Sequence, residues 1–264
     1  MSFPVKAVIF DWAGTMIDFG CMAPVHALRA VFEAEGVAIT DAEARADMGR
    51  AKLDHLKGLL SDPGVAARWR NAKGFDVDDT DIERLYQALQ PAMREAAARA
   101  SMLIPGAALT FKALRDLGVR IGSGTGYTRE MMQPILAAAA QQGYAPDVVI
   151  CAGETPSGRP APLMTWKALV ELDAWPARAC IKVDDASVGI EEGRLAGCWT
   201  VGITSSGNGV GLTREELDAL DPTERAERLA SAAAELTAAG ADFIIEDVSQ
   251  LMGVVEEIAR RLVA

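Results

Sequence analysis

The sequence contains few of the residues that build the commonest zinc and disulfide sites. It has two histidines and four cysteines in 264 residues. The cysteines are widely spaced and no two form a CxxC pair, which argues against a zinc site and a disulfide framework in a chain of this length. We therefore expect reduced thiols and a cytoplasmic protein. The four cysteines are Cys21, Cys151, Cys180 and Cys198.

Long apolar runs and an excess of positive charge are also absent. No apolar run reaches the roughly 20 residues that cross a membrane, and no basic leader precedes the first apolar segment. The formal net charge of −11 repels nucleic acid and anionic membranes, so we expect neither as a partner. An anionic substrate would have to be held locally, by backbone amides, a metal and one or two cations.

The sequence is rich instead in short apolar runs that alternate with helical patterns. Half of the residues are hydrophobic although only 6% are aromatic, a mixture that suits helices packed on a parallel sheet. The alternation predicts an α/β fold with a doubly wound parallel sheet. Predicted strands are Val5–Phe10, Val119–Ser123, Val148–Cys151, Cys180–Val183, Trp199–Ile203 and Phe243–Ile245, and predicted helices are Ala107–Leu117, Thr128–Gln142, Pro162–Leu172 and Ser187–Ala196.

One stretch breaks this alternation. Residues 21–99 contain helical patterns and no convincing strand, which predicts a helical cap domain inserted into a core of residues 1–20 and 100–264. The insert starts close to Asp11, so it is expected to cover the carboxyl end of the sheet, where open α/β sheets place their sites. Hinges are expected near Phe19–Pro24 and Ala100–Gly106. The glycine-rich segment Ser205–Gly211 lacks the spacing of a nucleotide-binding loop and is predicted to be a flexible surface loop.

Four polar residues fall at the ends of predicted core segments. They are Asp11, Thr125, Arg159 and Asp185. Each alone is commonly a turn or cap residue. Together they supply a nucleophilic carboxylate, a hydroxyl beside backbone amides, a cation and a second carboxylate for a metal, which is a set suited to phosphoryl transfer.

A lysine in the helical insert adds a second kind of chemistry. The segment Glu43–Leu60 is predicted to be one helix, and helical periodicity places Met48, Lys52, His55 and Leu59 on one face of it. An amine on an apolar face has a lowered pKa and can attack a carbonyl. The alternative is that Lys52 is a surface lysine whose stem crosses the stripe, and that His55 is structural.

The motifs FDWAGT (Phe10–Thr15), GTGYT (Gly124–Thr128), GRPAP (Gly158–Pro162) and KVDDASVGIEEG (Lys182–Gly193) occur in this order. In order and spacing they resemble the four motifs of the haloacid dehalogenase superfamily. Many of its phosphatases carry an acid two residues after the nucleophile, where this sequence has Ala13. Without that acid, an alkoxide leaving group would lack its proton donor. Gly124, Ala186 and Gly189 also depart from the usual pattern, and Asp184 is a candidate to replace the acid often found at 189.

Within the superfamily, the chain resembles the phosphonoacetaldehyde hydrolase family, through FDWAGTMIDFGCMAP, MGRAKLDHL, GYTREMM, QGYAPD, GRPAP and AGCWTVGI. The resemblance implies P–C bond cleavage of phosphonoacetaldehyde to acetaldehyde and phosphate, with Mg²⁺ as cofactor, a homodimer that meets through the cap, and a place after aminoethylphosphonate transamination. It implies that Asp11 is the nucleophile and Lys52 the Schiff-base lysine. It places Mg²⁺ on Asp11, the Ala13 carbonyl and Asp185, the phosphonate on Thr125, Gly126 and Arg159, and Met48, His55, Cys21 and Tyr127 around the substrate.

Two alternatives remain from the sequence. The first is another hydrolase of the superfamily, a phosphatase, phosphomutase or dehalogenase with a different small substrate. Ala13 argues against the first two, and the paired Asp184 and Asp185 argue against a metal-free dehalogenase. The second is a non-catalytic binding protein on the same fold, because a fold alone does not determine a function.

Overall fold

A parallel six-stranded sheet forms the centre of the molecule, for which a computed structural model describes residues 3–263. The strand order is β3-β2-β1-β4-β5-β6, and every neighbouring pair is parallel. The predicted fold class is therefore confirmed, and each predicted strand is present within two residues of its expected bounds. The strands are β1 (Ala7–Phe10), β2 (Arg120–Thr125), β3 (Val148–Cys151), β4 (Cys180–Asp184), β5 (Trp199–Ile203) and β6 (Phe243–Ile245).

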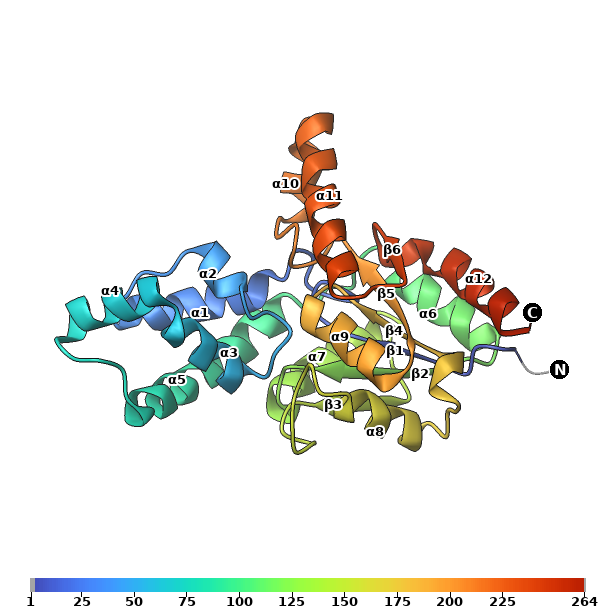
Figure 1. Cartoon of the computed structure of the whole chain (residues 1–264), viewed down its shortest axis with the longest axis horizontal. Coiled ribbons are helices and arrows are strands. Elements are labelled where there is room, and N and C mark those ends of the chain that lie inside the picture. The colour runs from blue at the N-terminus through green and yellow to red at the C-terminus, as the bar shows by residue number, and fades with distance from the viewer. Residues whose placement is uncertain (1–2, 264) are drawn as a thin grey trace.

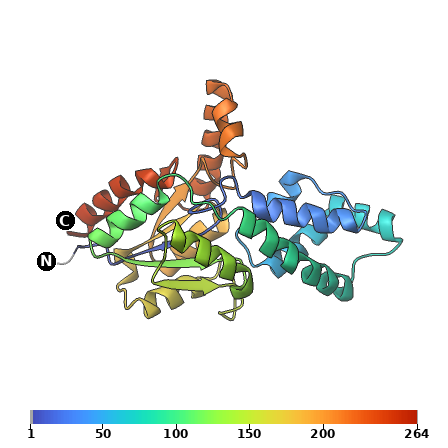
Figure 2. The same cartoon turned by 180° about the vertical axis from the view of Figure 1, so that it is seen from behind.

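Helices cover both faces of this sheet (Figures 1 and 2). Helices α8 and α9 lie on one face, and α6, α7 and α12 lie on the other. Side chains alternate between the two faces along β1, because successive residues of a strand point in opposite directions. Ala7 and Ile9 join the apolar cluster under α8, whereas Val8 and Phe10 join the larger cluster on the opposite face. Burial on both faces explains why the strands read as continuous apolar runs.

The four predicted core helices are present at nearly the same bounds, whereas α10, α11 and α12 were not predicted, and glycines follow two of the predicted helices. Gly118 and Gly197 have φ of 75° and 83°, a conformation that glycine adopts at little cost. The core helices are α6 (Ala107–Asp116), α7 (Arg129–Gln141), α8 (Leu163–Glu171), α9 (Ser187–Ala196), α10 (Arg214–Ala219), α11 (Pro222–Ala238) and α12 (Leu251–Val263), with 3₁₀ turns η1 (Ala177–Ala179) and η2 (Val248–Gln250).

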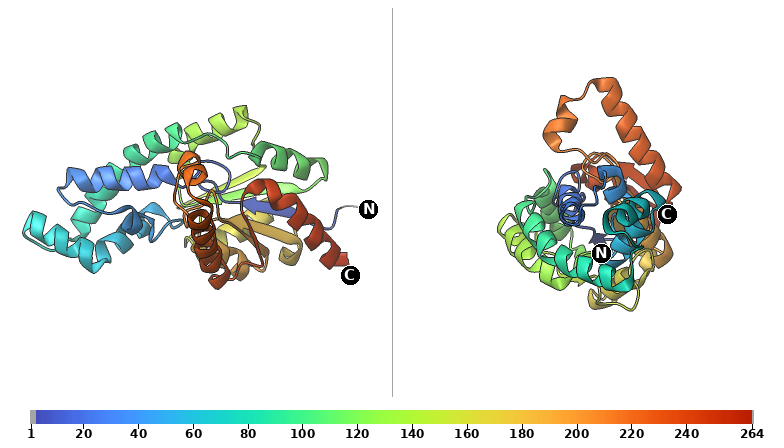
Figure 3. Two further views of the ribbon diagram at one scale, coloured as in Figure 1. Left: turned by 90° about the horizontal axis from the view of Figure 1, so that it is seen from above. Right: turned by 90° about the vertical axis from the view of Figure 1, so that its left-hand side faces the viewer.

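Five helices form a separate group beside the carboxyl end of the sheet (Figures 1 and 3). Helix α1 packs along α5, and α5 also contacts α7 of the core. The first of these helices begins at Met22 and the last ends at Arg99. The helices are α1 (Met22–Ala34), α2 (Asp41–Arg45), α3 (Lys52–Ser61), α4 (Pro63–Lys73) and α5 (Asp79–Arg99). We refer to residues 21–99 as the cap.

The single helix predicted over Glu43–Leu60 is wrong. The chain forms two short helices there, because α2 ends at Arg45 and α3 begins only at Lys52. Gly49 between them has a φ of 89°, a left-handed conformation that interrupts a right-handed helix. Met48 and Lys52 therefore do not share a helical face. Among residues 3–263, no helix has the length and apolar character needed to span a membrane.

Candidate active site

The carboxyl ends of the central strands bring the predicted polar residues together. Asp11 directly follows β1, Thr125 ends β2, and Asp185 directly follows β4. Phe10 of β1 is in register with Ser123 of β2 and with Val183 of β4. The three loops therefore start at the same edge of the sheet, which is the edge that faces the cap.

A small pocket lies where these loops meet the cap. Core and cap both contribute to its walls, so residues far apart in the sequence face one another. It is lined by Asp11, Ala13, Cys21, Pro24, Met48, Gly49, Lys52, Thr125, Gly126, Tyr127, Asp185 and Ala186. Of the residues predicted for the site, only Arg159 and His55 lie outside this lining.

Three buried carboxylates at the pocket form a candidate metal site. Asp11, Asp184 and Asp185 each offer an oxygen, and these oxygens lie within 4.8 Å of one another. Burial, followed by the charges of Asp11 and Asp184, raises the pKa of Asp185 to about 8. Burial, followed by the charge of Asp184, raises the pKa of Asp11 to about 6. Carboxylates crowded in this way suit a hard divalent cation with oxygen ligands.

Asp185 is also fixed by neighbouring groups that donate hydrogen bonds to it. Thr15 Oγ1 lies 3.0 Å from Oδ1, and Cys21 Sγ lies 3.2 Å from Oδ2. The backbone N–H of Asn208 donates to Oδ2 at 2.8 Å. A side chain on Gly14 would overlap this carboxylate and the Cys21 sulfur, so the motif FDWAGT requires glycine there. These contacts hold Asp185 in one orientation toward Asp11.

Arg159 holds the candidate nucleophile rather than facing the pocket. Its Nη1 donates to Asp11 Oδ1 at 2.7 Å, its Nε to Glu192 at 2.9 Å and its Nη2 to the Gly124 carbonyl at 2.8 Å. The side chain is fully buried and has the planar fork of donors that suits several acceptors at once. In this conformation Arg159 orients Asp11.

Sequence reasoning assigned no role to Lys182 and Glu192, which complete this ionic network. Lys182 is fully buried on β4, and its Nζ lies 2.7 Å from Asp184 and 3.7 Å from Glu192. Although burial alone would raise the pKa of Asp184, Lys182 and Arg159 hold it below its ordinary value. A lysine inside the buried strand CIKVD, two residues before an aspartate, is the sequence signal for this network.

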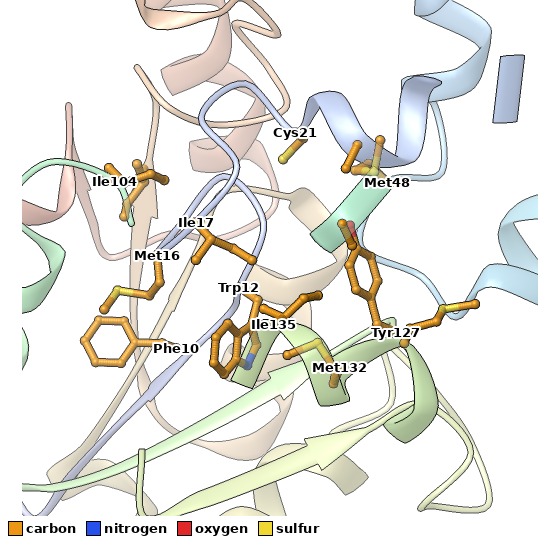
Figure 4. Close-up of a cluster of buried hydrophobic side chains, with 14 of the residues drawn as sticks. Phe10, Trp12, Met16, Ile17, Cys21, Met48, Ile104, Tyr127, Met132 and Ile135 are labelled. Atoms are coloured by element: carbon orange, nitrogen blue, oxygen red, sulfur yellow. The ribbon is translucent and has the colours of Figure 1, made fainter. Parts of the chain in front are cut away.

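Lys52 is placed across the pocket from the carboxylates. It is the first residue of α3 and only 3% exposed, and burial lowers its pKa to about 8. Its Nζ lies 5.4 Å from the centre of the Tyr127 ring. Figure 4 shows Tyr127 and Met48 beside the loop that carries Cys21. Met48 reaches the pocket from the loop before α3, so Met48 and Lys52 line the same pocket although the predicted shared helix is absent.

His55 is held inside the cap. It is fully buried and lies outside the pocket lining, and its Nε2 is 2.9 Å from the Ala44 carbonyl. Burial and then the charge of Lys52 lower the pKa of His55 to about 3, so the ring is neutral at ordinary pH. A neutral ring bound to a carbonyl at Nε2 carries its proton on that nitrogen. His55 therefore joins the end of α2 to α3 and packs behind Lys52.

The segment Ser205–Gly211 is wrongly predicted as a flexible surface loop. Residues 203–207 are buried, and Ser206 Oγ donates to the Gly14 carbonyl at 2.7 Å. Asn208 contacts Asp185 through its backbone. The glycines that suggested flexibility instead allow close approach, since a Cβ on Gly207 would lie 2.7 Å from that of Asp185. No sequence signal distinguishes these two uses of glycine.

Comparisons with known proteins agree with this geometry. Residues 5–197 match the model of the haloacid dehalogenase-like hydrolases. The chain is 47% identical over 98% of its length to phosphonoacetaldehyde hydrolase of Paraburkholderia phytofirmans, covering 97% of that protein. It is 38% identical over 97% of its length to the enzyme of that name from Bacillus cereus, again covering 97%. The crystal structure of a phosphonoacetaldehyde hydrolase-like protein from Oleispira antarctica, 43% identical, superposes with a TM-score of 0.97 over 98% of this chain and 94% of that one.

Proposed function

The chain belongs to the haloacid dehalogenase-like hydrolases and, among them, to the phosphonoacetaldehyde hydrolase family, and we propose that it cleaves the P–C bond of phosphonoacetaldehyde to give acetaldehyde and phosphate. The observation that carries this proposal is the pairing, in one pocket, of Asp11 with a buried lysine whose pKa is lowered to about 8. A carboxylate can attack phosphorus, and an amine with a lowered pKa can attack an aldehyde.

Ala13 explains why both groups are needed. In ester hydrolysis, an acid protonates the oxygen that leaves, and position 13 lines the pocket without one. A carbon leaving group has no lone pair to protonate, so the P–C electron pair needs another destination. An iminium formed between Lys52 and the aldehyde accepts this electron pair.

The proposed reaction begins at Lys52. Its neutral amine attacks the aldehyde carbon, and the uptake of a proton with the loss of water gives an iminium. Asp11 then attacks phosphorus, the P–C bond breaks, and its electron pair forms the enamine while Asp11 becomes an aspartyl phosphate. Protonation of the enamine carbon and hydrolysis of the imine release acetaldehyde and regenerate Lys52. Water hydrolyses the aspartyl phosphate to phosphate and restores Asp11.

We propose Mg²⁺ as the cation, held by Asp11, Asp185 and the backbone carbonyl of Ala13. Three buried carboxylate oxygens within 4.8 Å support a divalent ion there. When bound, Mg²⁺ supplies positive charge that offsets the repulsion between the phosphonate and these carboxylates.

Thr125, Gly126 and Arg159 are proposed to hold the phosphonate. Thr125 Oγ1 accepts from the Tyr127 N–H at 3.1 Å, which fixes its hydroxyl group at the pocket wall. Gly126 passes so close to the Arg50 carbonyl that a side chain would collide with it. Backbone amides and a hydroxyl at this wall suit phosphonate oxygens. Arg159 would contribute its charge from behind Asp11.

The division into domains, the oligomeric state and the cellular location are also part of this proposal. We propose a core of residues 1–20 and 100–264, a cap of residues 21–99, a homodimer that meets through the cap, and a cytoplasmic location. Light scattering from the eluting peak of a size-exclusion column measures the oligomeric state. A cap-surface substitution that yields monomers would locate the contact.

A phosphate-release assay tests the proposed function. The purified protein with Mg²⁺ should release phosphate from phosphonoacetaldehyde, and acetaldehyde should appear in equal amount. Hexose phosphates and small phosphate esters serve as competing substrates, because a phosphatase or phosphomutase would act on those. Faster turnover of an ester than of phosphonoacetaldehyde would overturn the proposal.

A further inference from the structure

Arg45 joins the cap to the segment Ser205–Gly211 of the core. It is the last residue of α2, and its guanidinium points out of the cap. Nη1 donates to the Gly20 carbonyl at 2.8 Å and to Asn208 Oδ1 at 3.2 Å, while Nη2 donates to the Gly211 carbonyl at 3.0 Å. Asn208 returns a hydrogen bond, from Nδ2 to the Arg45 carbonyl at 3.3 Å. We call this set of contacts the clasp.

The shape of the core segment fits the arginine. Gly211 has a φ of 65°, and a Cβ there would lie 2.8 Å from Arg45 Nε. Gly20 of the chain entry to the cap also runs against this segment, because its N–H donates to the Ser206 carbonyl at 2.7 Å. A side chain on Gly20 would collide with the Leu212 carbonyl. The clasp therefore gathers the cap, the entry to the cap and the core segment at one point.

The same core segment reaches the catalytic pocket. The Asn208 N–H donates to Asp185 Oδ2 at 2.8 Å, so the residue whose side chain binds Arg45 also fixes Asp185 through its backbone. Two residues earlier, Ser206 Oγ bonds the carbonyl of Gly14 in the loop of the nucleophile. A shift of this segment would alter both loops.

We propose that Arg45 is a positioning residue, which couples the seating of the cap to the orientation of Asp185 through Asn208. Lys52 is in the cap and Asp11 is in the core, so the proposed reaction requires the cap to be seated. The clasp makes the Asp185 arrangement depend on that same seating. Groups that orient a metal ligand alter metal affinity without touching the ion. The inference rests on the proposed function only in taking Asp185 as a ligand of Mg²⁺.

Arg45→Lys tests the proposal while preserving the positive charge. A lysine has a single donor group and does not reproduce the planar fork that spans three acceptors. We expect calorimetric titration of the metal-free protein with Mg²⁺ to give a dissociation constant raised about 3- to 10-fold, somewhat less than the 10- to 100-fold typical of direct outer-shell partners. Amide hydrogen exchange in peptides covering residues 204–212 should become about tenfold faster.

Asn208→Ala removes the core partner of the same side-chain contact and keeps the backbone N–H that donates to Asp185. It should change both readouts in the same direction, and the double variant should show less than the sum of the two single effects, since both variants remove the bond between the Arg45 and Asn208 side chains. It also carries the test if Arg45→Lys fails to fold. Arg29→Lys is the matched control, because Arg29 is a cap arginine that pairs with Asp41 on the surface. It should behave as wild type.

The readouts separate this inference from the proposed function. Hydrogen exchange and Mg²⁺ titration use no phosphonate, so they hold whichever substrate the enzyme takes. If wild type binds no Mg²⁺, the metal assignment fails, and exchange in residues 204–212 still reports on the clasp. Exchange and affinity equal to wild type in both variants would show that the clasp positions nothing and is only a surface contact.

Discussion

Asp184 occupies the space that a side chain at Gly189 would need. A Cβ built on Gly189 overlaps all the carboxylate atoms of Asp184, which is fully buried. The carboxylate bonds Lys182 Nζ at 2.7 Å and the Ala186 N–H at 3.1 Å, and it lies 3.5 Å from Arg159. The carboxylate of Asp184 thus lies where the side chain of an acid at position 189 would begin.

This exchange of positions predicts a compensating pair of substitutions. Gly189→Asp alone should collide with Asp184, lower stability by about 1–3 kcal/mol or more, and reduce activity strongly. Asp184→Gly alone should leave buried Lys182 without its nearest anion. The double variant should recover thermal stability and activity relative to both single variants. Thermal unfolding and phosphate release measure this, and a double variant as impaired as the worse single one would show that the two positions are not equivalent.

Removing the metal should abolish turnover and lower stability. Without a cation, burial and mutual repulsion hold the pKa of Asp185 at about 8 and that of Asp11 at about 6, so near neutral pH Asp185 is mostly protonated whereas Asp11 is mostly ionised. Mg²⁺ binds only the folded arrangement and should raise the melting temperature in a concentration-dependent way. Exhaustive treatment with EDTA, then Mg²⁺ back-titration, measures both effects. Full activity after chelation would remove the metal from the proposal.

The sequence predicted the sheet and the residues at its carboxyl edge because both depend on local patterns. Buried parallel strands read as apolar runs, and Asp11, Thr125 and Asp185 lie where those runs end. Parallel strands bring their carboxyl ends to one edge, so proximity followed from topology alone. Motif spacing also placed the chain in its family.

Local sequence patterns do not reveal contacts between segments that are far apart in the sequence. Met48 and Lys52 line the same pocket, although the left-handed Gly49 divides the single helix that would have placed them on one face. The sequence of Ser205–Gly211 alone does not indicate that its glycines allow close packing against Asp185. The orientation of Arg159 toward Asp11, and not toward the pocket, depends on Glu192, which is 33 positions later in the sequence. Such features arise from tertiary packing.

Asp11→Asn should separate the two halves of the proposed reaction. The amide is close in size and still accepts a hydrogen bond from Arg159, so the fold should persist. Phosphate release should fall by at least about 10³-fold, because removing a nucleophile has effects of this size or larger. Imine formation at Lys52 should continue, since that chemistry belongs to the cap. Mass spectrometry after borohydride should therefore find the adduct in this variant, and turnover near the wild-type rate would contradict the assignment.

Lys52→Arg should abolish turnover while preserving a positive charge. A guanidinium does not form an imine with the aldehyde and stays protonated. Borohydride with substrate should inactivate wild type and add a two-carbon or phosphonoethyl mass to the peptide containing Lys52, whereas the variant should gain no mass there. Lys167→Arg is the control, because Lys167 is partly exposed and bonds the Glu154 carbonyl on the core. An adduct that maps to another lysine would falsify the Schiff base at Lys52.

The rate of imine formation should follow the ionisation of Lys52. Burial lowers its pKa to about 8, and the amine attacks only when neutral. Borohydride trapping at saturating aldehyde should therefore rise with pH below 8 and level off above it, whereas an ordinary lysine, with a pKa of about 10.4, would keep gaining through pH 10. Asp11 raises the pKa of Lys52 by its negative charge, so in Asp11→Asn the midpoint should move to lower pH. A profile that climbs without a plateau to pH 10 would mean that the pocket does not desolvate this amine.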